Sequence, residues 1–488
     1  MKPTFRACMA WLHTWSGLTM GWLLLAMTLA GTLSVFRPEI NTWMRPELRT
    51  QSTINPDMAT QTAIQWLSVH AAKSPTWYLE AANARAPYVQ ALWLEGDAYQ
   101  DHALDPQTGS PSPLRDTRGG DFFYRFHFEL QLPYPWGRLI AAVAAMALVL
   151  ILLTGIIAHK RIFLDFFTFR PNKGQRSWLD AHNLLGVAAL PFHLMIAFTG
   201  ALTLANMLMP WGLTTLYHQD FSALEHDFNP AGIERPASGK AGTLAPIGPV
   251  LADINHRFAP NRLIRLTISN PSDAASVIQA IAAPSASGVG VETHTLSYDG
   301  TTGTLLAEHK EARPIMGFYR FLYGLHVAHF APVFTRWLYF LSGQGLAGVI
   351  ATGLHLWTSK RCQRHRGFGF RLVERVNIGM IAGIPTAFAC FFLANRLLPP
   401  SLATRAQIEV QTVFCVWAIL LLYAAVRPAT VAWRDLLGTA ALACLGVTLL
   451  NGLPVIPLQI GVGVTAFSLT CLFSYATWRM ACAAKEKS

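Results

Sequence analysis

The chain has 488 residues, of which 52% are hydrophobic and 13% are charged, and its formal net charge is +11. With a mean hydropathy of +0.32, this composition excludes an ordinary soluble domain and indicates an integral membrane protein. The excess positive charge falls in two short loops, 159–176 and 359–375. It therefore does not indicate nucleic-acid binding, and the positive-inside rule places both loops in the cytoplasm.

Apolar stretches of about 20 residues, long enough to cross a bilayer, recur along the chain. We expect a mainly α, polytopic helical membrane protein with about eight spans. The expected spans are 1–36, 137–158, 177–208, 335–358 and, within the C-terminal part 376–488, 376–397, 408–426, 433–453 and 456–478. The first is too long for a signal peptide and has no convincing cleavage site, so we expect it to be retained.

Two long polar segments, 37–136 and 209–334, separate the first four spans. Eight spans with cytoplasmic basic loops put both termini in the cytoplasm and both polar segments outside. Each polar segment has a helical stretch followed by strand-like runs. We expect each to form an external α/β domain that ends in a short aromatic helix, at 121–132 and 315–330 respectively, lying on the outer membrane interface.

The first four spans and their polar segments form a tandem repeat. Both halves begin in the cytoplasm, so the repeat is parallel and predicts a pseudo-two-fold axis along the membrane normal. The matching pieces are His13-x-x-x-Gly17 with His182-x-x-x-Gly186, Asp105-Pro-Gln-Thr-Gly109 with Asp299-Gly-Thr-Thr-Gly303, Phe126-His127-Phe128 with Leu325-His326-Val327, and Thr154-Gly155 with Thr352-Gly353. Asp and Gly at those spacings suit tight hairpin turns.

Histidines occur inside or beside these spans, where Asp and Glu are nearly absent. An ionisable residue at membrane depth is a functional hypothesis by default, and imidazole is a ligand of haem iron. On one continuous helix, His182 and His193 would share a face about 16 Å apart. That arrangement suits one haem in each leaflet. The alternative is that both histidines only contribute to packing.

The remaining candidate ligands fall into two groups by expected depth. The cytoplasmic group is His13, His159, His182 and His355, and the outer group is His127, His193, His326 and His329. His159 is equally well explained as a cation of the basic loop. The repeat counterpart of His193 is Leu24, which argues against strictly two-fold ligation of an outer haem.

These motifs resemble the PepSY-associated transmembrane protein family, whose members include inner-membrane reductases of ferric siderophores. The resemblance covers roughly residues 8–376. Its carriers are Leu12-His13-x-Trp15-x-Gly17-Leu18, Trp178-x-Asp180-x-His182-Asn183-x-x-Gly186, Pro191-Phe192-His193 and Thr352-Gly353-Leu354-His355-Leu356-Trp357. The family implies two external PepSY-type domains and a haem-binding helical core, and it implies nothing for residues 376–488.

Residues and resemblance together predict a di-haem b oxidoreductase of the bacterial inner membrane. The two haems would be non-covalent, because the chain has no C-x-x-C-H attachment motif, and no catalytic residue is expected beyond the haem ligands. The resemblance implies a ferric siderophore as the electron acceptor, with release of Fe(II). No nucleotide- or flavin-binding motif is visible, so the donor would be a cytoplasmic partner or the quinol pool.

We place the siderophore over the interfacial helices, with Arg125, Arg320 and Tyr323 as contacts. The alternative is that the side chains there only anchor these helices at the membrane interface. Two alternative functions stay open. One is a quinol-linked electron-transfer subunit that serves another periplasmic acceptor. The other is a non-enzymatic PepSY regulator or siderophore permease, in which the histidines only bind or sense.

Overall fold

The computed structural model describes residues 4–50, 55–159, 168–282, 288–290, 294–362, 367–452 and 457–485. The predicted basic loops lie partly outside the described residues, at 160–167 and 363–366. Two compact units are present: a helical unit of Met1–Met44, Thr117–Leu208 and Val333–Ser488, and a sheet unit of Arg45–Asp116 and Met209–Pro332.

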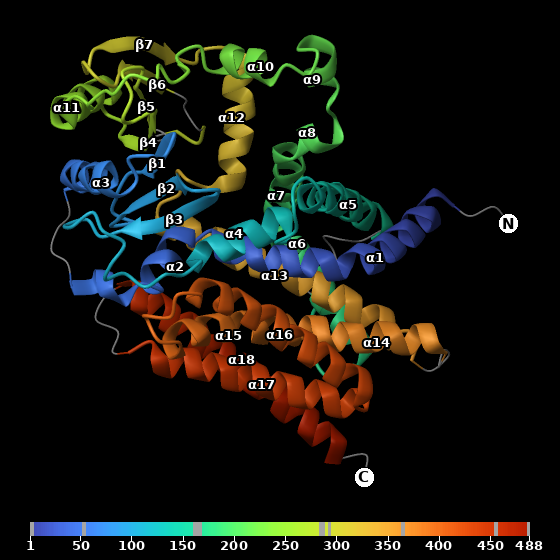
Figure 1. Ribbon diagram of the computed structural model, residues 1–488. Helices are drawn as coiled ribbons and strands as arrows, with labels where there is room; N and C mark the ends of the chain where they lie inside the picture. Colours follow the sequence, from blue (N-terminus) through green and yellow to red (C-terminus); the bar gives the residue numbers. More distant parts are fainter. Residues whose placement is uncertain are drawn as a thin grey trace. The chain divides into compact units, whose positions relative to one another are not determined.

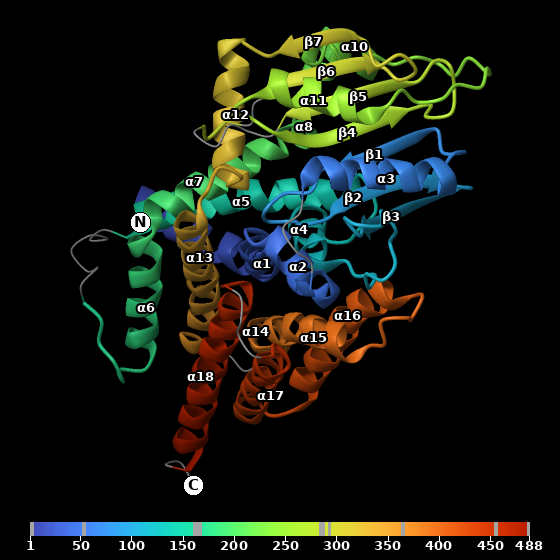
Figure 2. The ribbon, with the colours of Figure 1, turned by 90° about the vertical axis from the view of Figure 1, so that its left-hand side faces the viewer.

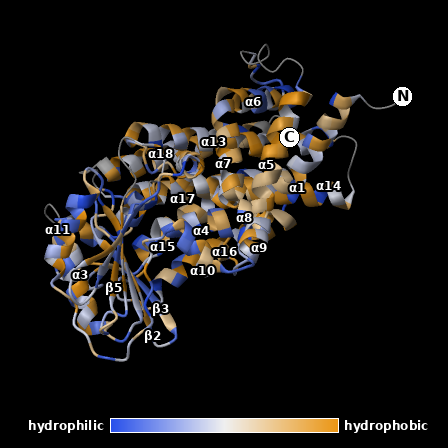
Figure 3. Cartoon of the chain, turned by 90° about the horizontal axis from the view of Figure 1, so that it is seen from above, coloured by the Kyte–Doolittle hydropathy of each residue, from blue (hydrophilic) through white to orange (hydrophobic). Residues whose placement is uncertain are grey.

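The helical unit contains the long helices of the chain, which are drawn in Figure 1. Its helices are α1 (Phe5–Ser34), α2 (Arg37–Trp43), α4 (Gly119–Glu129), α5 (Trp136–Ala158), α6 (Gln175–Ala188), α7 (Leu190–Thr203), α8 (Ala205–Leu208), α13 (Val333–Ser359), α14 (Phe368–Ile381), α15 (Gly383–Leu397), α16 (Arg405–Val426), α17 (Ala429–Leu450) and α18 (Pro457–Lys485). Helix α5 exposes one apolar stripe, formed by Ile140, Val143, Met146, Leu150, Leu153 and Ile157. The spacing of three or four residues gives a helix a single face, here suited to lipid, and Figure 3 shows the apolar colour along α5.

Within the described ranges, six helical stretches are long and apolar enough to cross a membrane. They are α1, α5, α14 together with α15, α16, α17 and most of α18, and the bent pair of α6 and α7 would make a seventh. Helix α13 has 27 residues, but Gln344 and several glycines lower the mean hydropathy of its sequence. The chain is therefore a multi-pass membrane protein, while the count of eight spans and the orientation stay predictions.

A break divides the expected third span. Helices α6 and α7 meet at Ala189 and are bent by 70°. Pro191 in the first turn of α7 has no N–H to donate, and its ring would clash with the carbonyl four residues earlier in a continuous helix. The prediction that His182 and His193 share one continuous helical stripe is therefore wrong.

The sheet unit contains one seven-stranded antiparallel sheet in the order β3-β2-β1-β4-β5-β6-β7. Its strands are β1 (Thr76–Glu80), β2 (Val89–Glu95), β3 (Ala98–Leu104), β4 (Leu263–Ser269), β5 (Val277–Ala282), β6 (His294–Asp299) and β7 (Leu305–Lys310). Each polar segment does supply a helix followed by strands, as expected. Strand β1 pairs with β4, so that Thr76 lies opposite Ser269, and the two segments form one sheet instead of two separate domains. That pairing covers two strand edges that separate domains would leave open.

Helices α3 (Pro56–His70) and α11 (Ile247–Phe258) cover one face of this sheet (Figure 2). Leu67 of α3 and Ile254 of α11 are fully buried in the same core as Leu266 and Leu296 of the strands. The sheet unit also contains η1 (Pro46–Thr50), α9 (Trp211–Leu216), α10 (Phe221–Phe228) and α12 (Pro314–Val327).

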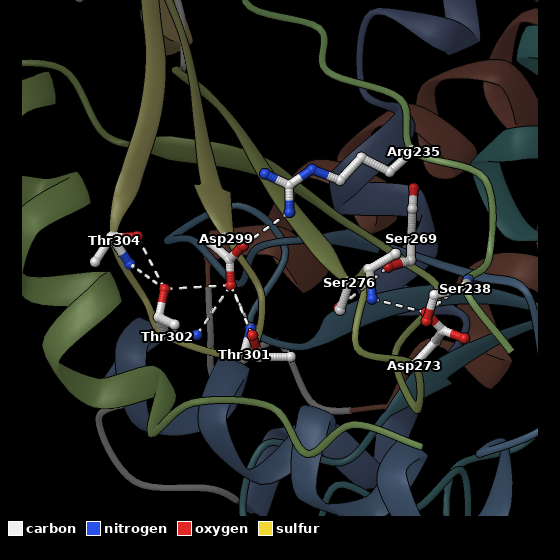
Figure 4. Close-up of polar contacts among 10 residues, drawn as sticks. Arg235, Ser238, Ser269, Asp273, Ser276, Asp299, Thr301, Thr302 and Thr304 are labelled. Carbon is white, nitrogen blue, oxygen red and sulfur yellow. Dashed lines mark hydrogen bonds and ion pairs between the residues drawn. The ribbon is translucent and has the colours of Figure 1, made fainter. Parts of the chain in front are cut away.

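Both turns predicted from the Asp-x-x-Thr-Gly sequences are present. Asp299 accepts hydrogen bonds from the backbone N–H groups of Thr301 (3.1 Å) and Thr302 (3.0 Å), and Gly303 adopts φ +73°. Figure 4 shows this turn with Arg235, which lies 2.7 Å from the Asp299 carboxylate. The ion pair with Arg235 and the turn donors hold the pKa of the Asp299 carboxyl well below its usual range. Asp105 forms the equivalent turn, with Gly109 at φ +68°.

Candidate functional site

Two of the predicted histidines face each other in the helical unit. His13 comes from α1 and His182 from α6, and their ring centroids are 6.4 Å apart with the planes at 68°. The Nδ1 atom of His13 lies 2.9 Å from the carbonyl oxygen of Ile151, and that of His182 lies 2.9 Å from the carbonyl oxygen of Val349. A carbonyl oxygen can only accept, so Nδ1 carries the proton. In the neutral form of each ring, Nε2 then carries the lone pair, the form in which imidazole binds metals.

The surroundings of the two rings are duplicated as well. Four residues after each anchoring carbonyl comes a glycine that lies against the same ring. This glycine is Gly155 for His13 and Gly353 for His182. A Cβ atom on Gly155 would lie 3.0 Å from Cε1 of His13, and one on Gly353 would lie 3.1 Å from Cε1 of His182. The sequence identified both Thr-Gly pairs as repeat marks, but it did not predict that their glycines make room for the histidine rings.

The spacing of the pair fits a haem held between the rings. A metal–imidazole bond is about 2 Å long, and the centroid of the ring lies about 1 Å beyond the bound nitrogen. His13 and His182 would be the residues that hold the iron of a haem, and their ring centroids, 6.4 Å apart, leave room for a metal between the rings. The protonated Nδ1 atoms and the two glycine notches suit the same arrangement.

The other two residues of the predicted cytoplasmic group have different partners. His355 lies with its ring centroid 4.5 Å from that of Trp178 and 6.1 Å from that of Trp433. His159 follows α5 directly, and its Nε2 lies 3.0 Å from the side-chain nitrogen of Asn183. Neither residue forms part of the His13–His182 pair, so their roles as ligands stay predictions.

On the expected outer side, His127 repeats the anchoring seen at the inner pair. Its Nδ1 lies 2.8 Å from the carbonyl oxygen of Met27 on α1. Its ring occupies a notch at Gly31, where a Cβ atom would come within 2.6 Å of the imidazole. The same logic puts the proton of a neutral His127 ring on Nδ1.

His193 of α7 is fully buried. Its Nε2 lies 3.3 Å from the carbonyl oxygen of Ser342. A hollow of about 390 Å³ lies at the break between α6 and α7, lined by Ala188, Ala189, Pro191, Phe192, Tyr339 and Ser342 among others. The pairing of His193 with an outer ligand stays a prediction.

The remaining predicted site residues are mostly in the sheet unit. Helix α12 carries Arg320, Tyr323 and His326, and the exposed His329 follows it. Arg320 lies 3.8 Å from Glu311, and hydrogen bonding from Arg313 lowers the pKa of the Glu311 carboxyl to about 2.

Tyr323 stacks near Tyr319, with ring centroids 6.3 Å apart. In the helical unit, the side chain of Arg125 is 56% exposed and lies 3.5 Å from Glu129. The roles of Arg125, Arg320 and Tyr323 at a substrate stay predictions.

Comparison with known sequences identifies the family. Residues 10–360 match the family described as the PepSY-associated TM region. The chain belongs to the PepSY-associated TM family. An uncharacterized protein of Pseudomonas aeruginosa is 29% identical over 346 residues, which cover 67% of this chain and 84% of that relative. The expected family is thus confirmed, and the match contains the whole tandem repeat.

The PepSY-associated TM match ends before α14, so the C-terminal helices α14–α18 lie beyond it. They are nevertheless joined to the repeat by buried polar contacts. Asn377 of α14 is 1% exposed, accepts from the indole N–H of Trp22 at 2.7 Å and donates to the carbonyl of Leu354 at 2.9 Å. Sequence reasoning assigned no residue to such contacts, although an Asn within an apolar span is a detectable signal.

Proposed function

We propose that this PepSY-associated TM protein is a haem-containing membrane oxidoreductase that passes electrons to an external ferric siderophore. The observation that carries the proposal is the pair His13 and His182, two neutral imidazoles at 6.4 Å within apolar helices. Haem bound there would supply one-electron chemistry inside the membrane. His127, anchored in the same way, and the buried His193 are the candidates for holding a second haem b.

The chain's own residues would prepare the inner site in three ways. The carbonyls of Ile151 and Val349 hold the Nδ1 protons and so fix the tautomer of both rings. Gly155 and Gly353 let the helices that carry those carbonyls approach the rings. Both rings are partly buried between the helices, and burial is one of the means by which a protein sets the potential of a bound haem.

The proposed acceptor follows from the family resemblance and from simple coordination chemistry. Siderophores bind iron through hard oxygen ligands, which hold Fe(III) far more tightly than Fe(II). One electron therefore releases the metal and leaves the chelator intact. Each Fe(III) consumes one electron, supplied by a quinol or by a reduced cytoplasmic partner. The direction of electron flow depends on the predicted cytoplasmic position of the two basic loops.

A reoxidation experiment tests this function. The purified protein is reduced with dithionite, freed of excess reductant and mixed with a ferric siderophore in a stopped-flow spectrometer. We expect the reduced haem bands to disappear while an Fe(II)-specific chelator captures one Fe(II) per electron. If no ferric siderophore reoxidises the protein, the siderophore reductase proposal fails and a quinol-linked subunit for another acceptor takes its place.

The same assay tests the proposed substrate contacts. Arg320→Gln and Tyr323→Phe should slow reoxidation while both haems are retained. Arg265→Gln is the matched control, because Arg265 also lies in the sheet unit and pairs with an acidic residue, Glu80, at 3.6 Å. Wild-type rates in both test variants would place the siderophore elsewhere.

A further inference from the structure

Helix α4 has 11 residues and carries both His127 and three buried phenylalanines. His127 contacts α1 at the carbonyl of Met27 and at Gly31. Phe122, Phe123 and Phe126 are 1%, 0% and 4% exposed, and Phe123 lies one turn before His127 on the helix. Whatever buries the three phenylalanines also determines where His127 lies.

These phenylalanines share a buried core with residues of α1 and α2, and their aromatic partners outside α4 come from α15 and α16, beyond the family match. Phe391 has its ring centroid 4.8 Å from that of Phe122 and 5.4 Å from that of Phe123. The ring centroid of Phe388 lies 5.1 Å from that of Phe123 and 6.0 Å from that of Phe126. Further ring contacts to this face come from Phe392, Phe414 and Trp417.

A buried polar cluster holds the beginning of α4. The hydroxyl of Thr117 donates to the carboxylate of Glu409 and accepts from the backbone N–H of Gly119 at 3.1 Å. Glu409 is fully buried, and it also accepts from Arg405 at 2.6 Å and from the side-chain amide of Asn395 at 2.9 Å. The segment that leads into α4 is thus hydrogen-bonded to the first turns of α16.

This cluster reaches the segment that follows α2 as well. The amide of Asn395 donates to the carbonyl of Met44 at 3.1 Å. Arg396 donates to the carbonyl of Trp43 at 2.7 Å, and its guanidinium lies 3.8 Å from the centroid of the Trp43 ring. The C-terminal helices therefore contact both the end of α2 and the residue that precedes α4 by two positions, Thr117.

We propose that the C-terminal helices α14–α18 are a positioning scaffold for α4, and that they act on the redox site by holding His127 against α1. The inference rests on the proposed function only in its last step, the role of His127 as a haem ligand. Thr117, Phe391 and Glu409 are the positioning residues. Helix α2 also contacts the beginning of α4, through Asn41, which accepts from the backbone N–H of Gly120 at 2.7 Å. The C-terminal helices add the aromatic partners of the three phenylalanines described above.

The physics of the membrane favours this reading over simple apolar covering. Lipid is as apolar as phenylalanine, so lipid alone could cover the aromatic face of α4 without fixing its position. Close aromatic packing and a fully paired buried carboxylate do fix it, because each has a preferred geometry. Removal of one partner leaves a buried polar group unsatisfied, so the arrangement tolerates few alternatives.

Hydrogen exchange of the α4 backbone tests the scaffold without requiring haem. The test variants are Thr117→Val, which removes the hydroxyl that binds Glu409, and Phe391→Leu, which removes two ring contacts. Each is expected to speed exchange in residues 119–129 by about tenfold. Thr412→Val is the matched control, since the Thr412 hydroxyl donates to the backbone of its own helix. Phe473→Leu is the second control, since Phe473 packs among α15, α17 and α18. Unchanged exchange in both test variants would overturn the scaffold.

Electron paramagnetic resonance of the haem-loaded protein tests the positioning step. Thr117→Val and Phe391→Leu should shift one haem signal, the one that is lost in His127→Ala, and leave the signal of the His13–His182 site unchanged. Thr117→Ser keeps the hydroxyl and should restore the wild-type signal. If the backbone amides of α4 exchange faster but neither haem signal moves, the scaffold does not position His127. The positioning step of the proposal is then wrong. If the wild type binds no haem, the proposed function fails, while the exchange result still decides whether the scaffold exists.

Discussion

The duplicated glycines beside the paired histidines give the sharpest structural prediction. Gly155→Ala would place a Cβ atom 3.0 Å from Cε1 of His13, and Gly353→Ala would place one 3.1 Å from Cε1 of His182, whereas ordinary contact begins at 3.4 Å. The ring or its helix must therefore move by about 0.3–0.4 Å. A shift of that size along the 2.9 Å bond from His13 to Ile151 takes it to the upper end of normal hydrogen-bond lengths.

The repeat supplies matched controls for both variants. A Cβ atom on Gly17 or Gly186 would meet nothing within 4 Å. In a helix interior, Gly→Ala by itself stabilises by about 0.5–1 kcal/mol, so Gly17→Ala and Gly186→Ala should be neutral or stabilising. Overpacking costs about 1–3 kcal/mol. The two test variants should therefore be less stable than their controls by about 1–3 kcal/mol.

The assay combines thermal unfolding with spectroscopy of the bound haem. Gly155→Ala and Gly353→Ala should each change the resonance signal and reduction potential of the same haem, and the double variant should change them most. The controls should leave both properties at their wild-type values. If test and control variants behave alike, the rings are not held by these notches and the geometry argued for the inner site is wrong.

Other predictions concern the second haem, the topology and the acid sensitivity. His193→Ala should lose one haem and keep the other, as seen in the absorption spectrum; full haem content would remove His193 from the ligand set. Single cysteines at Ser110 and Ser359 should react from opposite sides of the membrane with an impermeant maleimide, and same-side labelling would reverse the orientation. The pKa of Asp299 is depressed mainly by Arg235, so its contribution to stability is present above about pH 4 and is lost as pH falls further. Asp299→Asn keeps the turn acceptor but should show a smaller loss of thermal stability between pH 5 and pH 3, and an unchanged loss would contradict the assignment.

The repeat made the inner site predictable. Two His-x-x-x-Gly and two Thr-Gly pieces at matching positions indicated that His13 and His182 are equivalent, and the structure brings these rings together. The pairing of each Nδ1 with a carbonyl was not predictable, because a backbone acceptor has no sequence signature. His355 was grouped with the pair by depth alone; its ring contacts are with Trp178 and Trp433, and its role as a ligand stays a prediction.

Three features depended on information that a local pattern does not contain. Pro191 was visible, but a proline can kink a membrane helix slightly or divide it, depending on the neighbours that satisfy the freed carbonyls. The pairing of β1 with β4 joins segments almost 190 residues apart, and strand alternation does not specify such a partner. The burial of Arg405 and Glu409 depends on contacts with Thr117 and Asn395, which no spacing within α16 could indicate.

Haem quantification in single histidine variants tests the central claim most directly. The pyridine haemochrome of the purified wild type, expressed with adequate haem supply, should give about two haems b per chain. His13→Ala and His182→Ala should each remove the same one haem and leave the other with its wild-type spectrum. A wild type without haem, or a pair of variants that keep the full haem content, would contradict the account.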